Sequence, residues 1–135
     1  MTTQKQSSLP LRNQEDVVVA RQATRKWALE VGLNLVDQTK LITAASELAR
    51  NTVIYGGGGA MLLELLENGS SRGLRLTFED QGPGIPDIEK ALQDGYTTGN
   101  GLGLGLGGAK RLVNEFDIES AAGKGTRVAI TRWKS

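Results

Sequence analysis

Glu47 and Asn51 are a pair of side chains whose types and spacing could do chemistry. They lie four residues apart in a segment that reads as a helix, and this spacing brings both onto one helical face. A carboxamide oxygen suits Mg²⁺, which usually takes one or two protein groups together with phosphate oxygens. A carboxylate one turn away could accept a proton. Such a pair is often only a solvated surface, but here the neighbours Leu48, Ala49 and Thr52 are apolar or small, so the helix is not exposed all round.

A second segment whose residues could take part in binding or catalysis spans residues 79–86, with the sequence Glu-Asp-Gln-Gly-Pro-Gly-Ile-Pro. Asp80 ends an apolar run and precedes a backbone made flexible by Gly82 and Gly84. Alone, this pattern is equally typical of an ordinary strand-to-turn junction. Beside a Glu/Asn pair, the carboxylate could accept a hydrogen bond from the exocyclic amine of a base, while the glycines let a purine ring approach the backbone. The two segments together predict a nucleotide site.

The third segment is rich in glycine and spans residues 99–108. Gly103, Gly105 and Gly108 match the dinucleotide fingerprint G-x-G-x-x-G, but the preceding residues 95–100 read as a turn instead of the required strand. A Rossmann oxidoreductase is therefore disfavoured. A glycine-rich segment that leads into a helix can still bind phosphate. A flexible linker would carry Ser or Asn between the glycines, whereas this one carries Leu102, Leu104 and Leu106, which we interpret as apolar anchors of a lid over phosphates.

Composition excludes several other kinds of chemistry. The chain has no cysteine and no histidine, so disulfides, thiolate or imidazole metal sites, a Ser-His-Asp triad and a phosphoacceptor histidine are all ruled out. A net charge of +1 gives no electrostatic reason to expect a nucleic-acid or membrane-surface partner. No apolar stretch approaches the length of a membrane span, and the polar first residues do not resemble a signal peptide. We expect a cytoplasmic protein.

Hydrophobic periodicity and turn residues predict the order βααββααββ. A length of 135 residues favours one domain over 9–135, preceded by a disordered tail at 1–8. The expected elements are a short edge strand at 8–12, helices at 13–32 and 36–55, strands at 60–67 and 74–79, a short helix at 85–94, a helix at 102–116, and strands at 117–122 and 126–133. Two long helices would cover one face of a mixed sheet, giving a two-layer α+β sandwich.

In this order and spacing, the segments resemble the boxes of the GHKL (Bergerat) ATPase superfamily, and the resemblance covers almost the whole chain. The N box corresponds to residues 46–51, the G1 box to 80–85, the G2 box to 101–105 and the G3 element to 123–126. Within the superfamily, Ser-Glu-Leu-Ala-Arg-Asn and Glu-Asp-Gln-Gly-Pro-Gly-Ile-Pro-Asp resemble the RsbT-type switch kinases, which belong to the anti-sigma-factor serine/threonine kinase family.

The resemblance implies a role for each matching residue. Glu47 would be the catalytic base on the substrate hydroxyl, Asn51 the Mg²⁺ ligand, and Asp80 the adenine acceptor. The other implied nucleotide contacts are Gly82, Gly84 and Ile85 beside the adenine, Gly101, Leu102, Gly103, Leu104 and Gly105 along the phosphates, and Thr126 near the adenine.

The implied activity is ATP-dependent phosphorylation of a Ser or Thr on a STAS-domain antagonist protein in a bacterial partner-switching pathway. Release from a signalling complex and activation of a downstream phosphatase would follow, and related kinases can form homodimers. The lid lacks a cation before Lys110, so help at the γ-phosphate would have to come from Lys110, Arg111, the partner protein or Mg²⁺ alone. Arg50 is expected on a different helical face, without a firm site role.

Two other functions compete with this one. The protein could be a nucleotide-gated, non-catalytic binding module that sequesters a sigma factor or a phosphatase. A switch kinase can do both, so this function and the kinase activity are not fully exclusive. The ATP domain of a two-component histidine kinase is disfavoured, since the chain has neither a histidine nor a pair of dimerisation helices before the ATP module.

Overall fold

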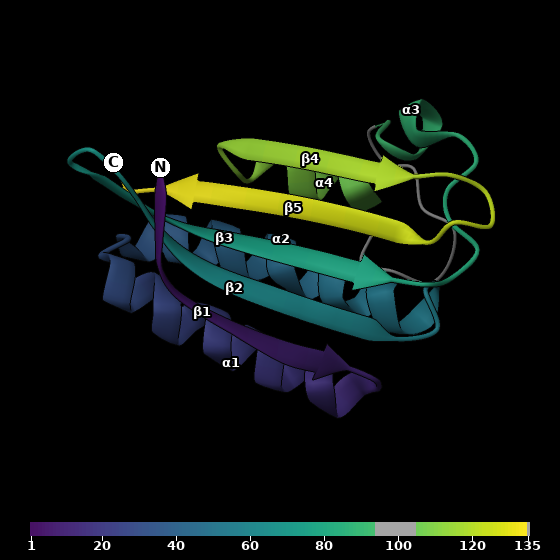
Figure 1. The fold of residues 1–135 in the computed structure, drawn as a ribbon, viewed down its shortest axis with the longest axis horizontal. Coiled ribbons are helices and arrows are strands. Elements are labelled where there is room, and N and C mark those ends of the chain that lie inside the picture. Colours follow the sequence, from purple (N-terminus) through teal and green to yellow (C-terminus); the bar gives the residue numbers. More distant parts are fainter. Residues whose placement is uncertain (94–104, 135) are drawn as a thin grey trace.

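The computed structural model describes residues 1–93 and 105–134 (Figure 1). The described elements follow the predicted order. They are β1 (Thr2–Leu11), α1 (Gln14–Val31), α2 (Leu35–Ile54), β2 (Gly59–Asn68), β3 (Ser71–Asp80), α3 (Ile88–Ala91), α4 (Gly105–Arg111), β4 (Glu115–Ser120) and β5 (Thr126–Trp133). The predicted α+β architecture is confirmed.

Local capping explains where the two long helices begin and end. The side chain of Asn13 accepts a hydrogen bond from the backbone N–H of Asp16 at the start of α1, as predicted for an N-cap. Gly32 ends α1 in the left-handed conformation that glycine adopts without strain. Asn34 then caps α2 in the same way as Asn13 caps α1, by accepting from the N–H of Asp37. The short connection brings the two helices side by side.

The strands form one sheet in the order β1-β2-β3-β5-β4 among the described residues. Every neighbouring pair in this sheet is antiparallel, so the expectation of a mixed sheet is wrong. The α1–α2 pair returns the chain to the end of β1, so β2 runs back along β1. The β4–β5 hairpin places β5 next to β3, and β5 runs in the opposite direction to β3.

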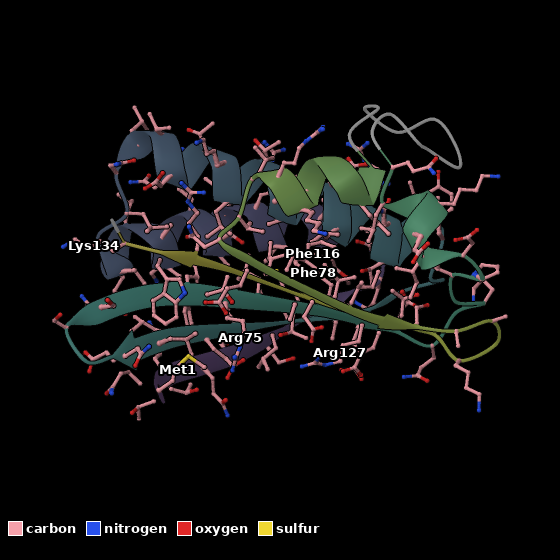
Figure 2. The ribbon with its side chains drawn as sticks, turned by 90° about the horizontal axis from the view of Figure 1, so that it is seen from above. Met1, Arg75, Phe78, Phe116, Arg127 and Lys134 are labelled. Atoms are coloured by element: carbon pink, nitrogen blue, oxygen red, sulfur yellow. The ribbon has the colours of Figure 1, made fainter. Side chains whose placement is uncertain are left out.

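Helices cover only one face of the sheet (Figures 1 and 2). The core lies between the two layers and includes Trp27 of α1, Leu41 and Leu48 of α2, and Phe78 of β3. Figure 2 views the sheet on edge: Phe78 and Phe116 lie on the helical side, whereas Arg75 and Arg127 lie on the open side. The site described below is built at the end of the sheet where this core layer meets the α2 C-terminus.

The N-terminal segment is a strand, and the disordered tail expected for 1–8 is wrong. β1 pairs with β2 from Thr2 opposite Glu67 to Leu11 opposite Gly59, with one register shift between Thr3 and Lys5. Its polar side chains bind partners distant in sequence. Lys5 Nζ lies 3.1 Å from Glu30 Oε1 and 4.4 Å from the centroid of the Trp27 ring. Backbone pairing with β2 therefore orders this segment, although its polar sequence lacks the alternation of apolar residues that is typical of a strand.

Among the described residues, no helix combines the length and the hydropathy that crossing a bilayer would require.

Candidate functional site

One transverse row of residues crosses the sheet at the end where β1 and β3 finish and β2 and β5 begin. Neighbours in this strand-end row are opposite one another in register, and the row consists of Leu11, Gly59, Asp80, Thr126 and Ser120. Asp80 comes two residues after the core residue Phe78, and Thr126 two residues before the core residue Val128. Because side chains alternate along a strand, Asp80 and Thr126 face the helical layer.

A pocket of about 910 Å³ lies between this row and the C-terminal half of α2. Its volume is in the range of a small-molecule site. Apolar and small side chains make up much of its wall, which suits the faces of a purine ring. Leu106, expected from sequence as an apolar anchor of a lid, lines the pocket. The lining residues without a site role proposed from sequence are Leu48, Arg50, Thr52, Ile54, Tyr55, Gly56, Phe78, Pro83, Pro86, Asp87, Lys90, Ala91 and Val128.

Glu47 is a buried carboxylate that faces this pocket. Only 4% of the residue is exposed, and its Oε2 atom has no hydrogen-bond partner within the described structure. A buried acceptor without a donor is costly unless a ligand supplies one. The nearest charged group is the guanidinium of Arg50, with Nη1 4.0 Å from Oε2. The site therefore holds a carboxylate oxygen that is available to a hydroxyl proton.

Arg50 lines the same pocket as Glu47 and Asn51, so the expectation that it lies on a different helical face is wrong. Residues three apart on a helix are neighbours on its surface, and this places Arg50 beside Glu47. Lys110 and Arg111, the cations considered from sequence, are exposed on α4 and do not line the pocket. The described part of the pocket wall instead carries Arg50 and Lys90.

Asp80 is held in place by the turn that follows it. Its Oδ1 atom accepts a hydrogen bond of 2.9 Å from the backbone N–H of Gly82. On its other side the end of α2 approaches closely, because a Cβ added at Gly56 would lie 2.5 Å from Asp80 Oδ2. The carboxylate is thus fixed at the pocket wall as a hydrogen-bond acceptor, as the nucleotide prediction requires.

The segment after Asp80 packs against the β4–β5 turn. The backbone N–H of Gly123 donates to the carbonyl of Pro83 at 2.6 Å. Gly84 has φ +76°, and a Cβ there would lie 2.0 Å from the carbonyl oxygen of Ala121. Gly125 also has a left-handed backbone, and its Cβ would lie 2.3 Å from the carbonyl oxygen of Asp80. Glycine is therefore required at both positions for the two turns to meet.

The structure brings most of the proposed site residues together. Those that line the one pocket are Glu47, Asn51, Asp80, Gly84, Ile85, Gly105 and Thr126. Gly82 does not line it, and its role is to let the turn approach α2, since a Cβ there would lie 2.8 Å from Gly56 Cα. The remaining four predicted positions, Gly101, Leu102, Gly103 and Leu104, lie outside the described residues.

The donor set of the pocket suits a metal ion that arrives with phosphate. Within residues 1–93 and 105–134 there is no group of three or more acidic side chains that could hold a metal by itself. Mg²⁺ in phosphoryl-transfer sites typically has one or two protein ligands and takes its other oxygens from phosphates and water. The Asn51 side chain in the pocket fits that pattern.

Sequence reasoning missed three contributors: Arg50, Gly56 and Ser120. Gly56 is the first of four consecutive glycines after α2, and nothing local distinguishes it from the others, because its contact with Asp80 depends on tertiary packing. Ser120 lies 35 residues from the Ile85 N–H that it accepts, so no local pattern identifies it. The i,i+3 spacing from Glu47 was the one signal that could have identified Arg50.

Comparison with known proteins shows the family to which the chain belongs. Residues 36–134 match the family model of histidine kinase-, DNA gyrase B- and HSP90-like ATPases. The chain is 46% identical over 128 residues to serine/threonine-protein kinase RsbT of Bacillus subtilis (strain 168), covering 95% of this chain and 96% of that protein. It is 31% identical over 119 residues to an anti-sigma F factor of Thermoanaerobacter sp. (strain X514), covering 84% of this chain and 82% of that protein.

Solved structures show the same fold at low sequence identity. The crystal structure of the RsbU and RsbW domains of Rv1364c from Mycobacterium tuberculosis superposes with a TM-score of 0.65 at 22% identity, covering 95% of this chain and 32% of that one. The mycobacterial sensor histidine kinase MprB has a TM-score of 0.54 at 20% identity, with 95% of this chain and 97% of that one covered. The chain therefore belongs to the histidine kinase-, DNA gyrase B- and HSP90-like ATPase family, and within it is a homologue of serine/threonine-protein kinase RsbT.

Proposed function

We propose that this protein is an ATP-dependent protein serine/threonine kinase that phosphorylates a Ser or Thr of a STAS-domain antagonist in a partner-switching pathway. Release from that partner would then activate a downstream phosphatase. The observation that carries the proposal is the buried Glu47 carboxylate, which lines the pocket and whose Oε2 atom lacks a hydrogen-bond partner within the described structure. A base for an acceptor hydroxyl needs such an unsatisfied oxygen.

In the proposed reaction, Glu47 accepts the proton of the acceptor hydroxyl as its oxygen bonds to the γ-phosphorus of ATP. The bond between that phosphorus and the bridging oxygen breaks, and ADP leaves. Asn51 would hold Mg²⁺, which supplies charge neutralisation on the phosphate oxygens. Asp80 accepts from the adenine amine. Arg50, beside Glu47, adds positive charge where the transferred group carries negative charge.

The test is transfer of label from γ-labelled Mg-ATP to a STAS-domain antagonist protein. Glu47→Gln keeps the shape of the side chain but removes its basicity, so it should bind ATP with unchanged affinity and transfer no label. Glu67→Gln is the matched control, because Glu67 lies on β2 with a 44% exposed side chain and does not line the pocket. Undiminished transfer by Glu47→Gln would refute the assignment of the base.

A second function remains in competition because one relative bears the name anti-sigma F factor. In that alternative, the nucleotide only sets the conformation of a non-catalytic module that sequesters a sigma factor or a phosphatase. Absence of label, despite measured ATP binding and a measured complex with the STAS-domain protein, would favour this binding module over the kinase.

A further inference from the structure

Ser120 occupies the β4 end of the strand-end row and joins three parts of the site by hydrogen bonds. Its Oγ accepts from the backbone N–H of Ile85 at 2.8 Å, and donates to the carbonyl of Gly125 at 2.8 Å. It also lies 2.8 Å from Oγ1 of Thr126. One hydroxyl therefore connects the segment after Asp80, the β4–β5 turn and the first residue of β5.

The donors and acceptors of this cluster fix the polarity of Thr126. A serine hydroxyl has one hydrogen to donate and two lone pairs to accept with. The Gly125 carbonyl can only accept, so it takes the single hydrogen of Ser120. The Ile85 N–H can only donate, so it occupies one lone pair. The contact with Thr126 can then form only if Thr126 donates into the second lone pair.

Once Thr126 donates its hydrogen to Ser120, it has only lone pairs left for a ligand. Thr126 lines the nucleotide pocket, whereas Ser120 does not. Thr126 is also the register partner of Asp80 across β3 and β5. The Asp80 carboxylate is itself an acceptor. Two neighbouring acceptors therefore meet the edge of a base that enters the pocket.

Two acceptors that face the 6 position of a purine select a substituent that donates there. Adenine presents an amino group with two hydrogens at its 6 position, whereas hypoxanthine and guanine present a carbonyl oxygen there. That oxygen would face the lone pairs of Asp80 and Thr126 without a hydrogen between them. Sites with buried polar groups reject a ligand that leaves those groups unpaired much more strongly than they reject a small change in size.

We propose that Ser120 is a specificity-determining positioning residue, which orients the hydroxyl of Thr126 so that the pocket selects a 6-amino purine over a 6-oxo purine. This inference rests on the proposed nucleotide-binding function. It does not depend on whether the protein transfers phosphate. Without Ser120, the Thr126 hydroxyl could rotate and donate to a 6-oxo group.

The experiment compares the dissociation constants of ATP and ITP by calorimetry, because these nucleotides differ only in the base. The variants are Ser120→Ala and Thr126→Val, and Ser70→Ala in the distant β2–β3 turn is the control. The wild type and the control should prefer ATP. In Ser120→Ala the dissociation constant of ITP divided by that of ATP should fall about tenfold, partly because ITP binds more tightly. Thr126→Val should also lower the ratio, and adding Ser120→Ala to it should change the ratio no further.

A purely structural role predicts a different result. Losing the Ile85 and Gly125 hydrogen bonds would loosen the pocket and weaken ATP and ITP by the same factor. An unchanged ratio in Ser120→Ala would therefore overturn the inference and leave the kinase proposal standing. Failure of the wild type to bind either nucleotide would overturn both. Loss of label transfer with the ATP preference intact would count against the kinase alone.

Discussion

Gly56 and Asp80 are in such close contact that no side chain fits between them. A Cβ at residue 56 would lie 2.4 Å from Cγ of Asp80 and 2.6 Å from its Cβ. Such distances do not occur between real atoms, so the α2 end or the carboxylate would have to move. The absence of a side chain at Gly56 is thus part of what positions Asp80, the proposed adenine acceptor.

We expect Gly56→Ala to weaken ATP binding tenfold to a hundredfold, since overpacking of this kind costs about 1–3 kcal/mol. Calorimetry with ATP measures the effect. Gly57→Asn is the control, because Gly57 has open space around it and φ +73°, which asparagine tolerates. An Ala variant that binds ATP like the wild type would show that the Asp80 position is not critical.

Arg50→Ala should reduce phosphate transfer about tenfold to a hundredfold, with ATP affinity changed less than about twofold. The reason is that its guanidinium lies 4.0 Å from Glu47, the proposed base, and can meet the transferred phosphoryl group, whereas the proposed adenine contacts are Asp80 and Thr126. Arg50→Lys should recover part of the rate. Steady-state transfer and equilibrium ATP binding, measured on the same variants, separate the two effects.

The comparison variant for Arg50 is Lys110→Ala, because Lys110 is exposed on α4 outside the pocket. It should retain wild-type transfer. If Lys110→Ala transferred phosphate slowly and Arg50→Ala transferred it at the wild-type rate, the cation at the transferred group would have to be assigned to α4.

Asp37→Asn should lower the free energy of unfolding by about 3–5 kcal/mol, the usual cost of leaving one buried charge without its partner. Asp37 Oδ1 and Arg132 Nη2 are 2.6 Å apart, with side chains only 8% and 15% exposed, and they join α2 to β5. Urea unfolding measures the loss. The double variant Asp37→Leu/Arg132→Met should recover most of it, because no buried charge remains.

A surface ion pair provides the contrast. Arg12→Ala removes a side chain that is 71% exposed and bound to Asp16, so it should lower the free energy of unfolding far less than Asp37→Asn does. Equal losses from the Arg12 and Asp37 variants would show that burial does not set the cost of these pairs.

Glu64 should make stability depend on pH in the acid range. Hydrogen bonds from Arg75 hold the pKa of Glu64 below its usual value, against the opposing effect of desolvation. A carboxylate with a depressed pKa in the folded state contributes stability that is fully present above the unfolded pKa, about 4.3, and is lost as pH falls through the folded pKa. Glu64→Gln should therefore be less stable than the wild type at pH 7, and the difference should shrink in acid.

Chemical unfolding of both proteins between about pH 3 and pH 7 tests this point. Glu67→Gln, on the same strand but 44% exposed, serves as the reference for losing a carboxylate. A Glu64→Gln difference that stayed constant down to the lowest pH would mean that the ion pair with Arg75 does not stabilise the fold.

Local signals predicted the elements well. Asn13 and Gly32 marked the ends of α1 because capping is decided by a few neighbouring atoms. The site residues Glu47, Asn51 and Asp80 were predicted from spacing and from a familiar set of boxes, and they do line one pocket.

Features that depend on distant partners could not be predicted in this way. The polar residues 1–8 lack apolar alternation, and their strand exists because β2, more than fifty residues later, pairs with it. The contact of Gly84 with Ala121 and the hydrogen bond from Ile85 to Ser120 likewise join segments far apart in sequence. Only tertiary packing shows that these residues belong to one site.

The pairing of β1 with β2 also has a consequence for how the chain folds. Both long helices lie between these strands in sequence, so closing the pair requires ordering a long loop, with Thr2 meeting Glu67. Contacts at such sequence separation form slowly, whereas the α1–α2 hairpin can form early from local contacts. During synthesis β1 must wait unpaired until β2 has been made. Its sequence Thr-Thr-Gln-Lys-Gln-Ser-Ser is polar and carries a charge. While this segment is still unpaired, that composition disfavours pairing with the strands of other chains.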